Sequence, residues 1–455
     1  MRRLRMFAVF AFCLLSSFDA PAQTAALSLI QDEETERVLR GWLTPVFQAA
    51  GLDASEMAIH LVRDDSINAF AAKGLHVFIH TGLITKSDSA QEVIAVLAHE
   101  TGHIAGGHIV RLYENIRIAR RNMLISMLVA SVAGVASGRG DVGLAAMTAG
   151  TASAQNLLMG YRRSEENAAD QSAVTFLKKT GHGLDGFRDI MKKLQAQENL
   201  SVDPKAGDML WRTHPEIKDR LAFILNQNDK MPKPDESRIR RENEEFKRIR
   251  AKLYAFLYPP EKTLKKFPQS DNSLPALYAR AVATYRSGRF DNAVAQMDAL
   301  IARYPDNPYF YELKGQILLE TGQAEKAVNA YEKAVSLLPD SVSLRVGYAQ
   351  ALTETDKRSD LIKAVDTLEP VAAIPSFSPF VWRLLAIAYG RSGRLDMAAY
   401  AQAENAFAQE DFLQAETFAR KAVDSLPENS AASIRASDIL EQTKSVKNAK
   451  KRLAH

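Results

Sequence analysis

The stretch VIAVLAHETGHIAGGH, residues 93–108, joins an apolar run to three histidines. The apolar run predicts a buried, rigid helix, and in a helix the positions i and i+4 share one face. His99 and His103 can therefore direct ring nitrogens at a single ion about 2.0–2.1 Å away. Glu100 lies about 100° round the same helix, where it can reach a water beside that ion but cannot ligate the ion itself. The stretch predicts a helix with two metal ligands and a general base.

A third ligand could come from the same stretch. In one known pattern a third histidine follows the second after six residues, with a glycine between them. Gly106 fits this pattern, but residue 109 is Ile109 and the histidine, His108, comes one residue early. One residue rotates a helical side chain by about 100°, so His108 is not expected to reach the ion. We expect it to be a structural or second-sphere group.

The other source of a third ligand is the stretch RRSEENAAD, residues 162–170. Glu166 and Asp170 are four residues apart, so a helix places them on one face. Glu166 could complete a His-His-Glu site, and Asp170 could accept the free ring N–H of a ligand histidine, which would orient that ring. Glu165 competes for the ligand role, but residue 169 is an alanine. Taken alone, this stretch would be read as a solvated helix face.

The C-terminal half contains a countable repeat. The residues Ala281, Gly288, Ala293 and Pro305 recur 34 residues later as Gly315, Gly322, Ala327 and Pro339. A third copy begins with Ala349 and then slips by about three residues to Ala364, and two further units follow around Trp382 and Ala415. This period, with small residues where paired helices touch, is typical of tetratricopeptide repeats. The sequence predicts an α-solenoid.

Length and composition fit two or three folded domains. The chain has 455 residues, 46% of them hydrophobic and 25% charged, with a net charge of +4. This small charge does not indicate nucleic-acid binding. Residues 59–84 contain short β-branched and aromatic runs broken by Ala72-Lys73-Gly74, which predicts a small antiparallel strand pair. Residues 228–273 predict an exposed, charged connecting helix. The expected fold is mainly α, with a zincin-type α+β domain that has a small β-sheet.

The first 22 residues predict an export signal: a basic start, an apolar run and the A-x-A site at Ala20–Ala22. Its cleavage would remove Cys13, the chain's one cysteine, so no disulfide is expected. Residues 123–136 are apolar but shorter than the roughly 20 residues that a membrane span needs. No integral span is therefore expected. Residues 123–155 could instead form a lid over the site or make a peripheral membrane contact.

These motifs together resemble the HtpX/Oma-type zinc metallopeptidases. The resemblance is carried by HExxH at 99–103, E-x-x-x-D at 166–170 and the upstream stretch NAFAAKGLHVFIHTGLI, residues 68–84. With the export signal and the repeats, it narrows to the periplasmic BepA/YfgC-like proteases of that family. The resemblance implies one Zn²⁺ per chain, with His99, His103 and Glu166 as ligands, Glu100 as the base and Asp170 as the acceptor behind a ligand.

The resemblance also implies two further groups. His214, in RTHPEIKDRL at 212–221, would approach the metal as a reversible ligand or steady the oxyanion. The same residues also fit a simple helix start, with Thr213 as the cap and Pro215 at the first helical position. Asn68, Ala69 and Phe70 would lie near an edge strand that pairs with the substrate backbone, a binding mode that explains loose sequence specificity.

The function that this resemblance implies is that of a periplasmic zinc endopeptidase that degrades misfolded or stalled outer-membrane proteins. The repeats would dock those substrates or the β-barrel assembly machinery, in association with the outer membrane. The alternative is a chaperone or assembly adaptor whose protease site is largely latent. The expected organisation is a signal peptide (1–22), a protease domain (23–227), a charged helical linker (228–273), a repeat domain (274–444) and a basic tail (445–455).

Overall fold

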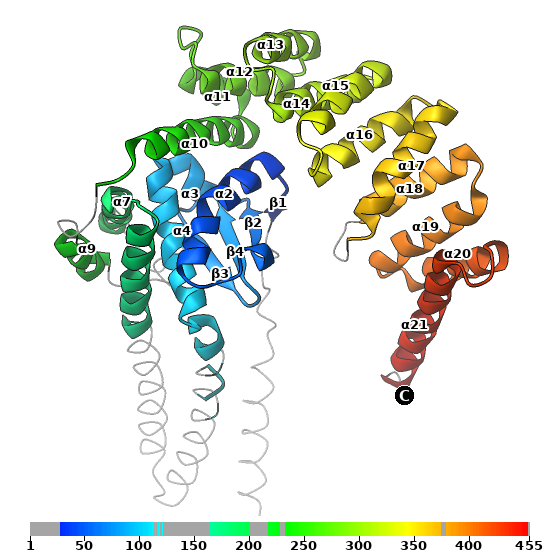
Figure 1. Cartoon of the computed structure of the whole chain (residues 1–455), viewed down its shortest axis with the longest axis horizontal. Coiled ribbons are helices and arrows are strands. Elements are labelled where there is room, and N and C mark those ends of the chain that lie inside the picture. Colours follow the sequence, from blue (N-terminus) through cyan, green and yellow to red (C-terminus); the bar gives the residue numbers. More distant parts are fainter. Residues whose placement is uncertain are drawn as a thin grey trace, which may run out of the picture. The chain divides into compact units, whose positions relative to one another are not determined.

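The structure is a computed structural model that describes residues 28–112, 114, 116–118, 121, 163–200, 217–227, 233–374 and 379–453. The chain divides into two compact units (Figure 1). Unit 1 consists of Met1–Asp32, Leu43–Asp88 and Glu92–Lys233, and unit 2 of Glu33–Trp42, Ser89–Gln91 and Pro234–His455. The expected signal peptide, the segment 123–155 and His214 all lie outside the described residues.

Unit 1 contains a four-stranded mixed sheet. Its strands are β1 (Leu29–Ile30), β2 (Ala58–Val62), β3 (Ala69–Ala72) and β4 (His76–His80), in the order β1-β2-β4-β3. β3 and β4 form the expected antiparallel pair, joined at residues 73–75, but β2 adds to β4 in parallel. The prediction of strand character up to residue 84 is wrong, because residues 81–86 form the helix α3 (Thr81–Lys86). β3 is an edge strand of the sheet.

The two faces of this sheet differ in burial. Ile59, Leu61, Val77 and Ile79 alternate along β2 and β4 and are buried. The other face carries aromatic rings from three strands, which stack on one another and are half-buried: His60, His76, Phe78 and Phe70. This period-two alternation is what sets the register of a sheet with one core face.

Helices complete unit 1. They are the C-terminal part of α2 (Glu33–Ala49), α3, α4 (Ala90–Ala105), a helix described over residues 163–179, α7 (Asp185–Leu200) and α9 (Ile217–Gln227). α4 is buried on nearly all sides, since its residues from Val93 to His103 are buried except Val96. The expectation of a buried helix under the histidine motif is borne out by this burial.

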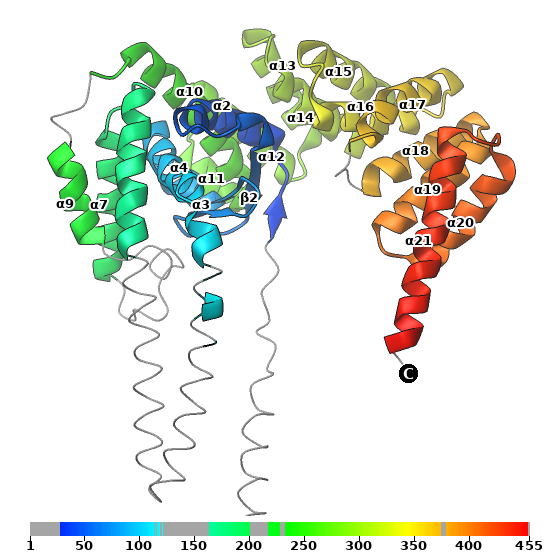
Figure 2. The ribbon, with the colours of Figure 1, turned by 60° about the horizontal axis from the view of Figure 1, so that its bottom comes forward.

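Unit 2 is built of helix pairs that follow one another along the chain (Figure 2). After α10 (Glu236–Leu257) and α11 (Pro260–Lys266) the repeats follow as helix pairs: α12 (Leu274–Arg286) with α13 (Phe290–Arg303), α14 (Pro308–Glu320) with α15 (Ala324–Leu337), α16 (Val342–Glu354) with α17 (Arg358–Ala372), α18 (Pro379–Ser392) with α19 (Leu395–Ala408), and α20 (Phe412–Ser425) with α21 (Ala431–Leu453). The predicted mainly α fold with a small sheet and a repeat solenoid is confirmed.

The repeat departs from its 34-residue period at a later place than the sequence predicted. The turns of the first three pairs have positive φ at Gly288, Gly322 and Asp356, which are spaced by 34 residues. The third pair therefore keeps the period, and buried Leu361 takes the position of Ala327. The placement of the slip before Ala364 is wrong. The three extra residues come between α17 and α18, whose first residue is 37 after that of α16.

The prediction that residues 228–273 form an exposed connecting helix is also wrong for α10. Its alternating charges cover only one side, while Phe246, Ile249, Leu253 and Tyr254 on the other side are buried. Ala251 and Ala255 belong to the same apolar cluster as the first repeat helices. α10 is thus part of the core of unit 2. The domain boundaries expected at 227 and 444 remain predictions.

Candidate metal centre

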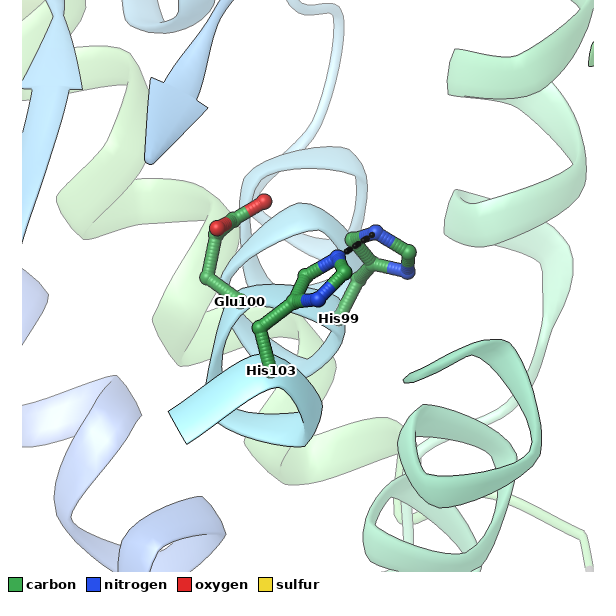
Figure 3. A group of neighbouring side chains, drawn as sticks. All are labelled: His99, Glu100 and His103. Carbon is green, nitrogen blue, oxygen red and sulfur yellow. Dashed lines mark hydrogen bonds between the residues drawn. The ribbon is translucent and has the colours of Figure 1, made fainter. Parts of the chain in front are cut away.

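His99 and His103 occupy successive turns of α4 and direct their rings toward each other (Figure 3). Their Nε2 atoms are 3.0 Å apart, and the two side chains are 4% and 9% exposed. His99, Glu100 and His103 form a buried group whose possible ligand atoms all lie within 4.8 Å of one another. The helical spacing therefore brings two ring nitrogens to one point inside the protein.

Glu166, from the helix over residues 163–179, reaches the same point. Its Oε2 lies 3.4 Å from Nε2 of His99 and its Oε1 lies 3.2 Å from Nε2 of His103. Ligand atoms held about 2.0–2.1 Å from a tetrahedral ion are separated by about 3.3–3.5 Å. The three observed separations are close to that value. Two imidazoles and one carboxylate are a donor set suited to zinc, so these residues fit such an ion.

A glycine in the motif explains how the two helices approach so closely. A Cβ built on Gly102 would lie 2.8 Å from the carbonyl oxygen of Ala169 and 3.0 Å from its Cα. Backbone cannot move aside as a flexible side chain can, so only glycine allows this contact. Ala169 lies between Glu166 and Asp170, and the contact therefore brings both carboxylates to α4.

Asp170 lies behind His99, as expected. Its Oδ1 is 2.8 Å from Nδ1 of His99, and it is 1% exposed. Burial opposes ionisation of this carboxyl, but Arg220 and the hydrogen bonds from His99 and Arg220 outweigh burial and lower the pKa of Asp170 to about 2. Burial and Arg220 disfavour the charged form of His99, yet the hydrogen bonds to Asp170 and Glu166 raise its pKa to about 9. Without a metal, this site therefore attracts a proton in its place.

Arg220, on α9, is a site residue that the sequence reasoning missed. Its Nε donates to Oδ2 of Asp170 at 2.8 Å, and its Nη1 lies 3.0 Å from Oε2 of Glu166. It is 5% exposed. A signal was present: Ile217, Leu221 and Ile224 form the buried stripe of α9, and a residue three positions after Ile217 falls on that stripe. A charged residue there must be buried and must find partners.

Glu100 is held by the edge strand. The backbone N–H of Ala71, in β3, donates to Oε2 of Glu100 at 3.1 Å, and Glu100 is 2% exposed. This N–H points away from β4. The backbone N–H of His80 donates to the carbonyl of Asn68 at 3.0 Å, and in an antiparallel pair the residues that bond to the neighbouring strand alternate, so Ala71 is one of the residues that face outward. The base position and the outer edge of the sheet are therefore adjacent.

The three residues expected at the substrate lie where this edge begins. Asn68 directly precedes β3, while Ala69 and Phe70 are its first residues. The Asn68 side chain is 1% exposed and its amide has no hydrogen-bond partner among the described residues. Together with His99, Glu100, Phe187 and Met191 it lines a small apolar pocket of about 30 Å³.

His108 does not reach the ligand atoms, as expected, but it contacts the ring of His103. The Nδ1 atoms of the two rings are 2.8 Å apart. Burial is the main cause that lowers the pKa of His108. Of the other predicted groups, His214 is not described, so the structure does not test its position.

This combination of a buried His-His-Glu cluster on paired helices, a small sheet and a repeat solenoid defines a metallopeptidase-like domain followed by interaction repeats. Residues 32–228 match the profile of Peptidase family M48, and residues 278–352 match that of the tetratricopeptide repeat. Residues 32–228 are thus similar to peptidase family M48, and tetratricopeptide-like repeats follow them in the chain. None of the helices in the described part of the chain is long and apolar enough to cross a membrane.

Several curated proteins are similar to this chain. The beta-barrel assembly-enhancing protease of Yersinia pestis is 26% identical over 354 residues, which cover 76% of this chain and 70% of that protein. Its namesake from Escherichia coli (strain K12) is 24% identical over 298 residues, 64% of this chain and 59% of that protein. The mitochondrial metalloendopeptidase OMA1 of Schizosaccharomyces pombe is 24% identical over 182 residues, 40% of this chain and 50% of that protein.

Proposed function

We propose that this chain is a periplasmic zinc endopeptidase of outer-membrane protein quality control, which degrades misfolded or stalled outer-membrane proteins. The observation that carries the proposal is the convergence of His99, His103 and Glu166 within 3.4 Å of one another, beside Glu100. The matches to the two beta-barrel assembly-enhancing proteases span 59–70% of those proteins, and the names of these proteins support the class of substrate.

In this proposal His99, His103 and Glu166 hold one zinc ion per chain. When bound, zinc supplies Lewis-acid chemistry, because it lowers the pKa of a water and polarises a carbonyl. Asp170 and Arg220 keep the ligands in place: Asp170 accepts from His99, and Arg220 bridges Asp170 and Glu166. These contacts fix the ring of His99 in the tautomer that leaves Nε2 free to ligate.

Glu100 is the general base in this proposal. It takes a proton from the attacking water and delivers that proton to the leaving amine. The N–H of Ala71 stabilises the ionised carboxylate and fixes its direction, since hydrogen bonds to a charged acceptor are strong and directional. His214, which the family resemblance implies, would act near the metal as a reversible ligand or as an oxyanion donor.

Substrate would bind as an added strand along β3. Ala69 and Phe70 are in this edge strand, where the backbone groups of Ala69 face away from β4 and can pair with an extended chain, whereas those of Phe70 face Phe78 of β4. The buried amide of Asn68 lacks a partner among the described residues and lies beside Glu100, so a substrate peptide group is a suitable partner for it. Because the main chain does most of this binding, loose sequence specificity is expected.

The repeats would dock unfolded or misassembled outer-membrane proteins or the β-barrel assembly machinery. Unit 2 contains a hollow of about 460 Å³ between α13, α14 and α15, and its wall carries both signs of charge together with the ring of Tyr311. Such a mixed lining suits a peptide with polar and apolar side chains. The predicted export signal supports a periplasmic location for these events, and association with the outer membrane is part of the proposal.

The variant Glu100→Gln tests the proposal. It keeps the size of the side chain but removes the base, so we expect cleavage of an unfolded β-barrel outer-membrane protein to fall by at least about 100-fold. Zinc content should stay that of the wild type, because Glu100 is not a ligand. Cleavage at the wild-type rate by a zinc-loaded Glu100→Gln protein would refute the proposal.

A specific observation also supports the second candidate function, a chaperone or assembly adaptor with a largely latent site. The groups that would act on a substrate are enclosed: His99, Glu100 and Glu166 are 2–4% exposed. Outer-membrane integrity in a strain that carries only Glu100→Gln separates the two. Full integrity would favour the adaptor, and loss of integrity would favour the protease.

A further inference from the structure

The ring of His108 lies against a proposed metal ligand although it follows the end of α4. Its Nδ1 is 2.8 Å from Nδ1 of His103, and the ring centroids are 4.9 Å apart with the planes at 76°. His108 is 5% exposed and His103 is 9% exposed. Water therefore does not compete effectively for this hydrogen bond.

The positions of the protons follow from ligation. A hydrogen bond between two ring nitrogens requires a proton on one of them and a lone pair on the other. If Nε2 of His103 ligates a cation, that nitrogen carries no proton, so the proton of His103 is on Nδ1. Nδ1 of His103 must then donate and Nδ1 of His108 must accept, which leaves the proton of His108 on its Nε2.

We propose that His108 is a positioning residue that orients the metal ligand His103 by accepting its Nδ1–H. The inference rests on the proposed function, because it requires the metal site of His99, His103 and Glu166. His108 then does for His103 what Asp170 does for His99, and each of the two imidazole ligands has its own buried acceptor.

Two glycines make this contact possible. In a continuous helix residue 108 would lie about 140° from residue 103, facing away from it. The helix instead breaks after Ala105, and Gly107 has φ of +66°, a conformation that favours glycine. A Cβ on Gly106 would lie 2.4 Å from Nε2 of His108. The Gly106-Gly107 pair therefore both turns the chain and leaves room for the ring.

Zinc affinity tests the inference directly. Full-length protein would be titrated with zinc against a chelator of known affinity, in the wild type and in His108→Ala and His108→Asn. Partners of metal ligands typically contribute about 10–100-fold to metal affinity, and we expect His108→Ala to bind zinc that much more weakly. Asparagine carries its amide oxygen near the position of Nδ1, so His108→Asn should recover most of the affinity.

The matched control is His182→Ala. His182 is as buried as His108, but its ring bonds to Thr180 at 2.9 Å and lies outside the metal cluster. The affinity of the His182→Ala protein for zinc should stay within about twofold of the wild type. Thermal unfolding of each variant in EDTA would show that the protein is folded. If His108→Ala fails to fold, Gly106→Ala, which displaces the ring without removing it, should weaken zinc binding in its place.

The outcomes separate this inference from the proposed function. A wild type that binds no zinc would refute the proposed function itself. If the wild type binds one zinc and folded His108→Ala binds it equally well, the role of His108 is overturned while the proposed function stands. The role is also overturned if His108→Asn binds zinc as weakly as His108→Ala, because the hydrogen-bond acceptor would then not matter.

Discussion

At the residue scale, the i, i+4 spacing on two helices brings four side chains together at the candidate metal centre. His99, His103, Glu166 and Asp170 all lie where the i, i+4 rule places them. Arg220 was not predicted, although Ile217, Leu221 and Ile224 mark its side of α9 as buried. Helical periodicity states which residues share a face but not which distant helix covers it, so the partners of Arg220 could not be derived.

The structure makes Arg220 a residue with a large energetic role. Its removal leaves Glu166 and Asp170 as two buried carboxylates side by side. Breaking a buried pair in this way typically costs about 3–5 kcal/mol, and we expect Arg220→Met to lower the stability of metal-free protein by that amount in urea unfolding. The control Arg188→Met removes two partly exposed pairs, with Asp185 and Asp189, and should cost less than about 1 kcal/mol. Equal losses in the two variants would contradict the assignment.

At the scale of elements, β3 is the part that the sequence described incompletely. The β-branched and aromatic runs at 59–84 predicted strands, but they could not show that β2 pairs in parallel with β4 or that β3 lies at the edge next to Glu100. Strand pairing across intervening residues is a tertiary property. The role of Ala71 is invisible in the sequence for the same reason, since its backbone N–H rather than its side chain makes the contact.

The variant Ala71→Pro tests that contact. Proline removes the N–H that Glu100 accepts, and edge strands tolerate proline where no ladder hydrogen bond is lost. A hydrogen bond to a charged group contributes about 1.5–3 kcal/mol, so kcat for peptide cleavage should fall about 10–100-fold with zinc content unchanged. Ala71→Ser, which keeps the N–H, serves as the control. If Ala71→Pro keeps the kcat of Ala71→Ser, the edge strand does not position the base.

The aromatic face of the sheet gives a prediction for pH. Burial, with a smaller contribution from His76, lowers the pKa of His60 from its ordinary value near 6.5. The unfolded chain therefore binds a proton at His60 more readily than the folded chain does. Protonation of His60 thus costs no folding free energy above about pH 6.5 and lowers the free energy of unfolding as the pH falls below that value. His60→Phe keeps a ring to stack on Phe78. The unfolding free energy of His60→Phe should fall less than that of the wild type between pH 7.5 and pH 5. Equal decreases in the two proteins would refute the role of His60 in the pH dependence.

At the scale of the whole molecule, the sequence predicted that the metal-site domain precedes the repeats. It did not predict that short segments of the N-terminal half belong to the same compact unit as the repeats. The 34-residue spacing needs only local counting, whereas α2 is a single amphipathic helix whose residues 33–42 belong to unit 2 and whose later residues belong to unit 1. An amphipathic pattern shows that one side is buried but not what covers it. The error about α10 has the same cause.

A buried charge network fixes the first part of α2 within unit 2. Glu34 is fully buried and accepts hydrogen bonds from Arg248 at 2.8 Å and Tyr278 at 3.1 Å, with Lys252 at 3.1 Å. Glu34→Gln leaves two cations without their counter-charge, and we expect unit 2 to lose about 3–5 kcal/mol in denaturant unfolding. Glu325→Gln, which breaks an exposed pair with Lys357, should cost less than about 1 kcal/mol. If Glu34→Gln loses no more unfolding free energy than Glu325→Gln, the buried charge network does not stabilise unit 2.

We propose that His99, His103 and Glu166 together hold one zinc ion, and elemental analysis of purified protein measures that occupancy. The wild type should contain one equivalent of zinc per chain. Glu166→Ala should lose most of it, whereas Glu165→Ala, altered at the neighbouring residue, should keep it. Full stoichiometric zinc in folded Glu166→Ala would contradict the account.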